Sequence, residues 1–223
     1  MNRVIKSVVI LAAMAATVTI AREANVSLAV EPGSKLSLTG SSTVHAYSST
    51  ASRLRVVFTH EPARWQAALP RGEAIEQLIR EHGVTAIEVT VDVNGLKSGK
   101  DGLDKNMYKA LRAEKHPEIC FTLGSYEVAD GAKPGEMAIT AKGKVSVAGA
   151  ERELKIAATA VRQGDSVRLR GDVPLKMTQF GIKPPTMMMG TLRTSDDVAI
   201  HFDLLIGASQ PAIAGDSAGG AGR

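Results

Sequence analysis

The sequence predicts an all-β domain, an antiparallel eight-stranded lipocalin-like barrel with one or two short helices. Apolar and polar residues alternate with a period of two over many short segments, as in strands with one buried and one wet face. Turn signals rich in Gly, Pro and Asp separate these segments. A sheet of this size protects its edges best by closing on itself, and a barrel of about eight strands has room for one ligand.

The alternation places the individual strands. It is clearest in 85–93, where Thr, Ile and Val occupy the odd positions and Ala, Glu, Thr and Asp the even ones. Strands are predicted by this criterion over 85–93, 137–147, 154–160, 167–173 and 198–206, with weaker examples over 26–30, 35–39, 52–58 and 119–128. Short connections from Met137 onward predict an antiparallel meander.

Two helices interrupt the strands. The first begins near Pro70 and ends at Gly83, and one face carries Ile75, Leu78, Ile79 and His82. His82 is therefore expected in the packing face of this helix and not as a metal ligand.

The second helix carries Met107, Tyr108 and Leu111 on one face. Asp104 is its expected N-cap, and Pro117 prevents its continuation.

The ends of the chain are expected to lie outside the folded domain, which we place at 25–206. Residues 1–24 combine Arg3 and Lys6 with an apolar run over 8–20 and small residues after it, as in a secretory signal peptide. A periplasmic or secreted location follows. The stretch 207–223 is rich in Gly, Ala and Ser without apolar periodicity, so we expect a disordered tail.

The segment 177–194 is strongly apolar, yet Gly181, two prolines and Gly190 prevent a regular helix or central strand. It contains half of the eight methionines in the chain. Methionine lines adaptable apolar surfaces well. The segment is either the end of a hydrophobic core or the lip of a pocket for an apolar ligand.

Signals for catalysis, metals and nucleic acid are missing from the sequence. The five histidines are scattered singly, and Cys120 is the only cysteine, so there is no internal disulfide. A triad assembled from distant residues stays open. The formal net charge of +4 is too small, and its basic residues too dispersed, for a nucleic-acid surface. We therefore expect no catalytic residue, no metal and no cofactor.

Four ordered motifs resemble those of the YceI-like family. They are Gly40-Ser41-Ser42-Thr43-Val44-His45; Ser98-Gly99 leading into Leu103-Asp104-Lys105-Asn106-Met107-Tyr108-Lys109-Ala110-Leu111; His116-Pro117-Glu118-Ile119-Cys120-Phe121; and Phe180-Gly181-Ile182-Lys183-Pro184-Pro185-Thr186. The resemblance covers about 35–206. The sequence departs from the family pattern at Ala46-Tyr47, at Gln179 and in an enlarged insertion over 65–82.

The resemblance implies an exported, lipocalin-like barrel that binds a polyisoprenoid or isoprenoid-quinone lipid in an apolar cavity, for carriage or storage, without enzymatic activity. The residues that it implies as cavity lining are Met107, Tyr108, Leu111, Phe121, Phe180, Ile182, Met187, Met188 and Leu192. The implied partner is the isoprenoid lipid, with transient membrane contact. Homodimer formation stays open.

Two other functions stay open at this point. Met177 and Met187 to Met189 could supply soft sulfur ligands to Cu(I) in a periplasmic copper-binding protein. The protein could also be an enzyme that acts on an isoprenoid lipid.

Overall fold

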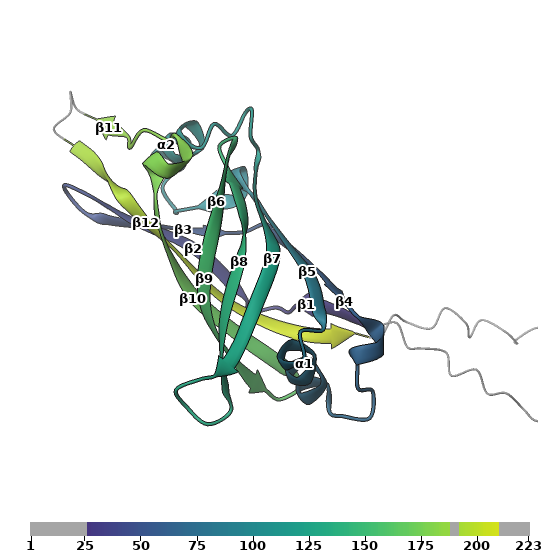
Figure 1. Cartoon of the computed structure of the whole chain (residues 1–223). Helices are drawn as coiled ribbons and strands as arrows, with labels where there is room; N and C mark the ends of the chain where they lie inside the picture. Colours follow the sequence, from purple (N-terminus) through teal and green to yellow (C-terminus); the bar gives the residue numbers. More distant parts are fainter. Residues whose placement is uncertain (1–25, 188–191, 210–223) are drawn as a thin grey trace, which may run out of the picture.

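The fold is a strongly curled antiparallel sheet with a short helix at each end (Figure 1). The computed structural model describes residues 26–187 and 192–209. Among these residues, twelve strands form the sheet: β1 (Ser27–Val30), β2 (Lys35–Ser42), β3 (Ala46–Ala51), β4 (Leu54–His60), β5 (Val84–Asp92), β6 (Leu96–Lys97), β7 (Glu118–Asp130), β8 (Glu136–Val147), β9 (Ala150–Gln163), β10 (Ser166–Lys176), β11 (Thr186–Met187) and β12 (Leu192–Ser209). The helices are α1 (Arg71–Arg80), α2 (Asp101–Ala110) and the 3-10 helices η1 (Pro62–Arg64), η2 (Val93–Gly95) and η3 (Met177–Phe180). No helix in the described part of the chain is long and apolar enough to cross a membrane.

The strand order is β4-β5-β7-β8-β9-β10-β12-β2-β3-β6, with β1 and β11 paired to β12 beside this path. The antiparallel, mainly β architecture is confirmed, and so is the meander through β8, β9 and β10. All nine segments with period-two alternation form strands. The sheet exceeds the predicted eight because β3 lacks apolar alternation and β6 and β11 have two residues each, too few to show any period.

The sheet curls until its ends approach each other, which makes it a half-barrel. Within the described residues no ladder joins β3 to β4. The ends meet at one corner instead, where the Ser52 amide donates to the Gly95 carbonyl at 2.8 Å. At the other end of the barrel, β1 pairs with β12 and contacts β4. Short segments therefore close the gap that the long strands leave.

One hydrophobic cluster closes the end of the half-barrel that carries α1. We refer to it as the α1-end cluster; its buried members are Leu28, Ile75, Leu78, Ile79, Val84, Met137, Ile139, Ala160, Val167 and Ile206. The helix forms because its apolar residues recur at helical spacing after Pro70, with Glu73 in the first turn and Arg80 in the last. Gly72 allows close approach, since a β-carbon there would overlap the carbonyl of Gly164.

A second cluster includes residues of η3 and packs against α2, which lies at the end of the half-barrel opposite α1 (Figure 1). This α2-end cluster contains Val145, Val147, Ala148, Phe180 and Ile182 as buried members. Partly buried residues of α2, β7, β9 and β10 pack against it. The two clusters therefore sit at the two ends of the half-barrel.

Two local predictions, those for His82 and Asp104, are wrong. His82 follows α1, takes a left-handed conformation (φ 58°) and stacks on Tyr126 in place of joining the helix face, because the chain must reverse there into β5. Asp104 lies inside α2, whose N-cap is Lys100. β12 continues to Ser209, three residues beyond the predicted end of the domain, because Ser27–Val30 pairs with it.

The predicted ends lie largely outside the described residues. Positions 1–24 of the predicted signal peptide and 210–223 of the predicted tail are not among the described residues. The segment 177–194 is only partly irregular, since it contributes η3, a left-handed turn at Gly181 (φ 65°), β11 and the first residues of β12.

Candidate functional site

A cavity of about 650 Å³ occupies the middle of the half-barrel, between the two hydrophobic clusters. Its volume lies well within the range of ligand-binding cavities, roughly 300–1,000 Å³. Packed protein interiors contain few voids larger than a water molecule. A cavity of this size is therefore large enough to hold a ligand and is not a packing defect.

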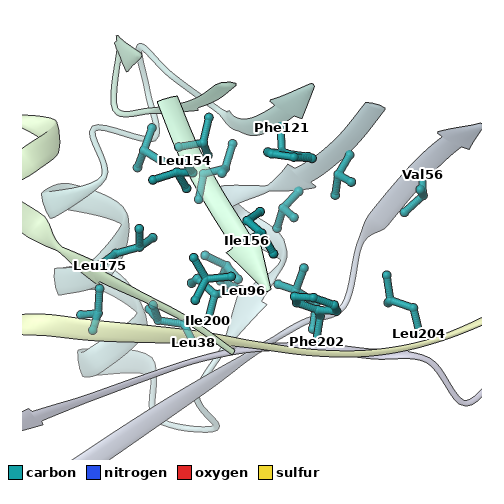
Figure 2. A pocket seen from close by; sticks show the side chains of 18 of the residues that line it. Leu38, Val56, Leu96, Phe121, Leu154, Ile156, Leu175, Ile200, Phe202 and Leu204 are labelled. Carbon is teal, nitrogen blue, oxygen red and sulfur yellow. The ribbon is translucent and has the colours of Figure 1, made fainter. Parts of the chain in front are cut away.

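The cavity wall is the inner face of the sheet. Alternate residues of each strand point inward because side chains change face at every position. Figure 2 shows ten of these side chains, from seven strands, converging on the cavity: Leu38, Val56, Leu96, Phe121, Leu154, Ile156, Leu175, Ile200, Phe202 and Leu204. All ten are hydrocarbon side chains, so this part of the wall offers a ligand apolar contact and no hydrogen-bonding group.

Three aromatic rings pack against this wall, each beside a glycine of a neighbouring strand. The pairs are Tyr47 on Gly40, Phe121 on Gly143 and Phe202 on Gly171. A β-carbon at Gly143 would come within 2.6 Å of the Phe121 ring, and one at Gly171 would overlap the Phe202 ring. The glycines give the rings room beside the backbone and so keep them out of the cavity.

Polar lining residues gather at the α2 end. With the exception of Tyr126 at the other end, the polar side chains that line the described cavity are Ser42, His45, Tyr47, Lys100, Asn106, Lys176 and Thr194. The β2–β3 hairpin, β11 and the start of β12 lie together beside this end (Figure 1), since Ser42 pairs with Thr194 and Thr186 with Arg193. The polar and partly exposed rim indicates that the cavity opens here.

Two lysines on this rim differ in their surroundings. The Lys176 ammonium donates to Asp197 at 2.5 Å, and this contact raises the pKa of Lys176. The side chain of Lys100 has no hydrogen-bond or ion-pair partner among the described residues. Burial raises the pKa of Tyr47, so its hydroxyl stays protonated and can donate to a ligand near the opening.

Polar contacts hold α2 at the opening. Asp104 is 5% exposed, and its carboxylate accepts from the amide and the hydroxyl of Ser98 at 2.9 Å and 2.5 Å. These hydrogen bonds lower the pKa of Asp104. Beyond the helix, Arg112 donates to the carbonyls of Ala148 and Gly181 at 3.3 Å and 3.0 Å. The second helix is therefore tied to β6, the β8–β9 turn and η3.

The residues predicted to line a cavity separate into three groups. Five do line it, namely Met107, Leu111, Phe121, Phe180 and Ile182. Tyr108 does not: its hydroxyl donates to the Leu96 carbonyl at 2.7 Å and accepts from Lys97 at 2.9 Å, so it anchors α2. Met187 and Leu192 lie on β11 and β12, and their side chains, like the whole of Met188, fall outside the described residues.

Most of the wall was not predicted as a site. Ile156, Ile200 and Phe202 sit on the apolar face of correctly predicted strands. The period-two signal identifies that face as buried but is the same for a solid core and a hollow one. A sequence signal that was available is the glycine opposite an aromatic residue, as in Gly171 and Phe202.

Thr39, His201 and Asp172 are in contact in the order hydroxyl, imidazole, carboxylate, as in a catalytic triad. His201 lies 2.7 Å from the Thr39 hydroxyl through Nε2 and 2.5 Å from Asp172 through Nδ1. All three side chains are on the outer face of the sheet, and none lines the cavity. The His201 and Asp172 side chains are 41% and 75% exposed. Water reaches these side chains freely. The backbone amides of these paired strands already donate hydrogen bonds within the sheet, so they do not form an oxyanion hole beside His201.

The described residues contain no group of three or more His, Cys, Asp or Glu side chains that could hold a metal ion. Met177, one of the methionines considered for Cu(I), lines the cavity and packs against the α2-end cluster.

Comparisons with known proteins agree with this architecture. The YceI-like domain matches residues 33–206. This chain belongs to the YceI-like family. A search of curated proteins found no match to the YceI-like chain.

Two solved structures share the fold of this YceI-like protein. BcnA from Burkholderia cenocepacia is 15% identical with a TM-score of 0.55, over 77% of this chain and 95% of BcnA. A polyisoprenoid-binding domain from Saccharophagus degradans, implicated in plant cell wall breakdown, is 13% identical with a TM-score of 0.57, over 82% and 98% of the two chains. At these identities the likeness concerns the fold.

Proposed function

We propose that this YceI-like protein is an exported lipid-binding protein that encloses a polyisoprenoid or isoprenoid-quinone tail for carriage or storage. The observation that supports it most is the hydrocarbon lining of the 650 Å³ cavity. A hydrophilic ligand would lose its hydrogen bonds to water there and regain none. A hydrocarbon tail loses nothing.

The polar residues of the rim support a ligand orientation in which the tail lies inside the cavity and the head group lies at the opening. Lys100, Tyr47 and Asn106 offer polar contact at the opening, where the head group of a lipid would sit with its tail inward. The polyisoprenoid-binding description of the Saccharophagus domain, which has the same fold, is consistent with this ligand class.

The energetics suit reversible transfer. Burial from water stabilises a tail by about 0.8 kcal/mol per methylene, so direct release of a long tail into water is negligible. A tail in a bilayer is already in hydrocarbon, and its transfer into an apolar cavity is close to balance. Transient membrane contact is therefore part of the proposal, and binding in place of catalysis is the activity that we infer.

Mass spectrometry of an organic extract of the purified protein tests the proposal. The informative variant is Ile200→Asn, which places an amide on the cavity wall, and its control is His201→Asn, one position along β12 on the outer face. We expect a stoichiometric isoprenoid in the wild type and in His201→Asn, and its loss in folded Ile200→Asn. An extract without lipid from all three proteins would refute the function.

Export is tested separately. The proposal expects that protein recovered outside the cytoplasm of cells expressing the full chain begins after about residue 24, as N-terminal sequencing would reveal. Protein that retains Met1 and stays in the cytoplasm would contradict it.

A further inference from the structure

The end of the cavity opposite the rim is closed by α1. Ile75 and Ile79 of this helix line the cavity, together with Leu28, Val167 and Ile206 of three strands. Ile75 is fully buried and Ile79 is 8% exposed. A tail that enters at the α2 end therefore meets the side chains of α1 after crossing the half-barrel.

This floor is anchored firmly. Tyr126 donates to the Ile79 carbonyl at 3.2 Å and accepts from the Val84 amide at 3.3 Å. Arg162 of β9 contacts Glu73 and Glu76 on the outer side of the helix at 3.1 Å and 3.5 Å. Hydrogen bonds on one side and ion pairs on the other therefore hold α1 across this end of the half-barrel.

The cavity volume sets a capacity. A cavity of about 650 Å³ that is closed at one end encloses a tail only up to a limiting length, set by the distance from the rim to α1. A much longer tail would leave its head-group end outside the rim, exposed to water at about 0.8 kcal/mol per methylene.

We propose that α1 is a ruler: Ile75 and Ile79 stop the tail and so set the longest isoprenoid that the cavity encloses. The ruler rests on the proposed function, since it presupposes that an isoprenoid occupies the cavity. It assigns a role to the segment 65–82, which the sequence predicts to be an insertion and which contains the whole of α1. Tail length is then decided by the position of α1 at the end of the cavity.

The helix offers its own control. Leu78 is fully buried in the α1-end cluster, but it does not line the cavity. It packs instead beside Gly83, where a β-carbon would overlap its methyl group. Leu78→Ala removes as many carbons as Ile75→Ala without opening the floor toward the tail.

The experiment offers purified, lipid-stripped protein an equimolar series of all-trans prenols that differ by one isoprene unit, and identifies the retained prenols by mass spectrometry. The variants are Ile75→Ala/Ile79→Ala, which removes six carbons from the floor, Ile79→Phe, which adds volume there, and Leu78→Ala. Thermal unfolding verifies that each is folded.

The ruler predicts a sharp upper limit in the wild type. This limit moves up by about one isoprene unit in Ile75→Ala/Ile79→Ala, moves down in Ile79→Phe and is unchanged in Leu78→Ala. If the double variant does not fold, the downward shift in Ile79→Phe decides the result. An equal upper limit of prenol length in wild type and Ile79→Phe, or a higher limit in Leu78→Ala, would overturn the ruler. The proposed function would still stand in either case, because the protein would still retain prenols. Retention of no prenol by the wild type would overturn both.

Discussion

Gly40→Ala is expected to weaken tail binding while leaving the free protein stable. The β-carbon that this substitution adds would come within 3.0 Å of Tyr47 Cε2 and closer still to Cζ and Oη, where ordinary contacts are about 3.5–4.0 Å. The ring must therefore withdraw by about 1 Å. It can move only away from the wall, into the lumen beside the rim.

The magnitude depends on whether the lumen is occupied. In the free protein the ring moves into empty space, and the three nearest neighbours of the new methyl group are all atoms of the Tyr47 side chain, with no backbone atom among them. With a tail bound, ring and tail compete for the same volume, and overpacking of this kind costs about 1–3 kcal/mol. We therefore expect a Kd about tenfold higher or more, since about 1.4 kcal/mol corresponds to tenfold.

The assay is titration with a fluorescent apolar probe such as cis-parinaric acid, in parallel with urea unfolding. Gly171→Ala is the contrast, because its β-carbon would lie 2.6 Å from the Ala157 carbonyl, which cannot swing aside, so this variant should lose about 1–3 kcal/mol of stability. Gly40→Ala/Tyr47→Ala should regain the affinity of Tyr47→Ala alone. Wild-type affinity in Gly40→Ala, or no recovery in the double variant, would refute the reasoning.

Three further predictions concern the ligand and the second helix. Removal of bound lipid should lower the melting temperature in calorimetry, since ligand at about 100 times its Kd stabilises by about 2.7 kcal/mol; an unchanged value would contradict occupancy of the cavity. Arg112→Ala should cost about 1–2 kcal/mol and speed hydrogen exchange in α2, because it loses its hydrogen bonds to Ala148 and Gly181; unchanged exchange would refute the anchoring role. Because the pKa of Asp104 is lowered, its ionised carboxylate contributes fully to folding stability above the ordinary carboxyl pKa, and this contribution is lost as the pH falls through the lowered pKa. Asp104→Asn should therefore make the stability measured by urea unfolding depend less steeply on pH in the acid range. An equally steep dependence would contradict this.

The strands and the family could be predicted from local sequence. Segments such as 85–93 and 137–147 alternate with a period of two, and the nine alternating segments all form strands. The four motifs identify the family, whose domain matches 33–206. Both signals are carried by neighbouring residues, where the backbone geometry of a strand or turn is fixed by sterics and side-chain type.

Residue-level predictions at α2 were less successful. Met107, Leu111, Phe121, Phe180 and Ile182 reach the cavity, whereas Tyr108 turns its hydroxyl to Leu96. Helical periodicity places Met107, Tyr108 and Leu111 on one face, but that face spans both the cavity and β6. An aromatic ring with a hydroxyl goes where a carbonyl can accept its proton, and sequence spacing does not reveal that partner.

By itself, the sequence determined which face of each strand is buried, because burial follows from the alternation of side chains along an extended chain. Only the tertiary structure decided that the buried faces enclose a cavity. The same Ile, Leu and Val pattern fills a solid core when sheets pack together and lines a hollow when one sheet curls far enough. The curl, the rings of Tyr47, Phe121 and Phe202 held against glycines of neighbouring strands, and the seating of α1 across one end are contacts between segments that the chain brings together only on folding. Local physics constrains each segment, but the volume left between them depends on how they meet.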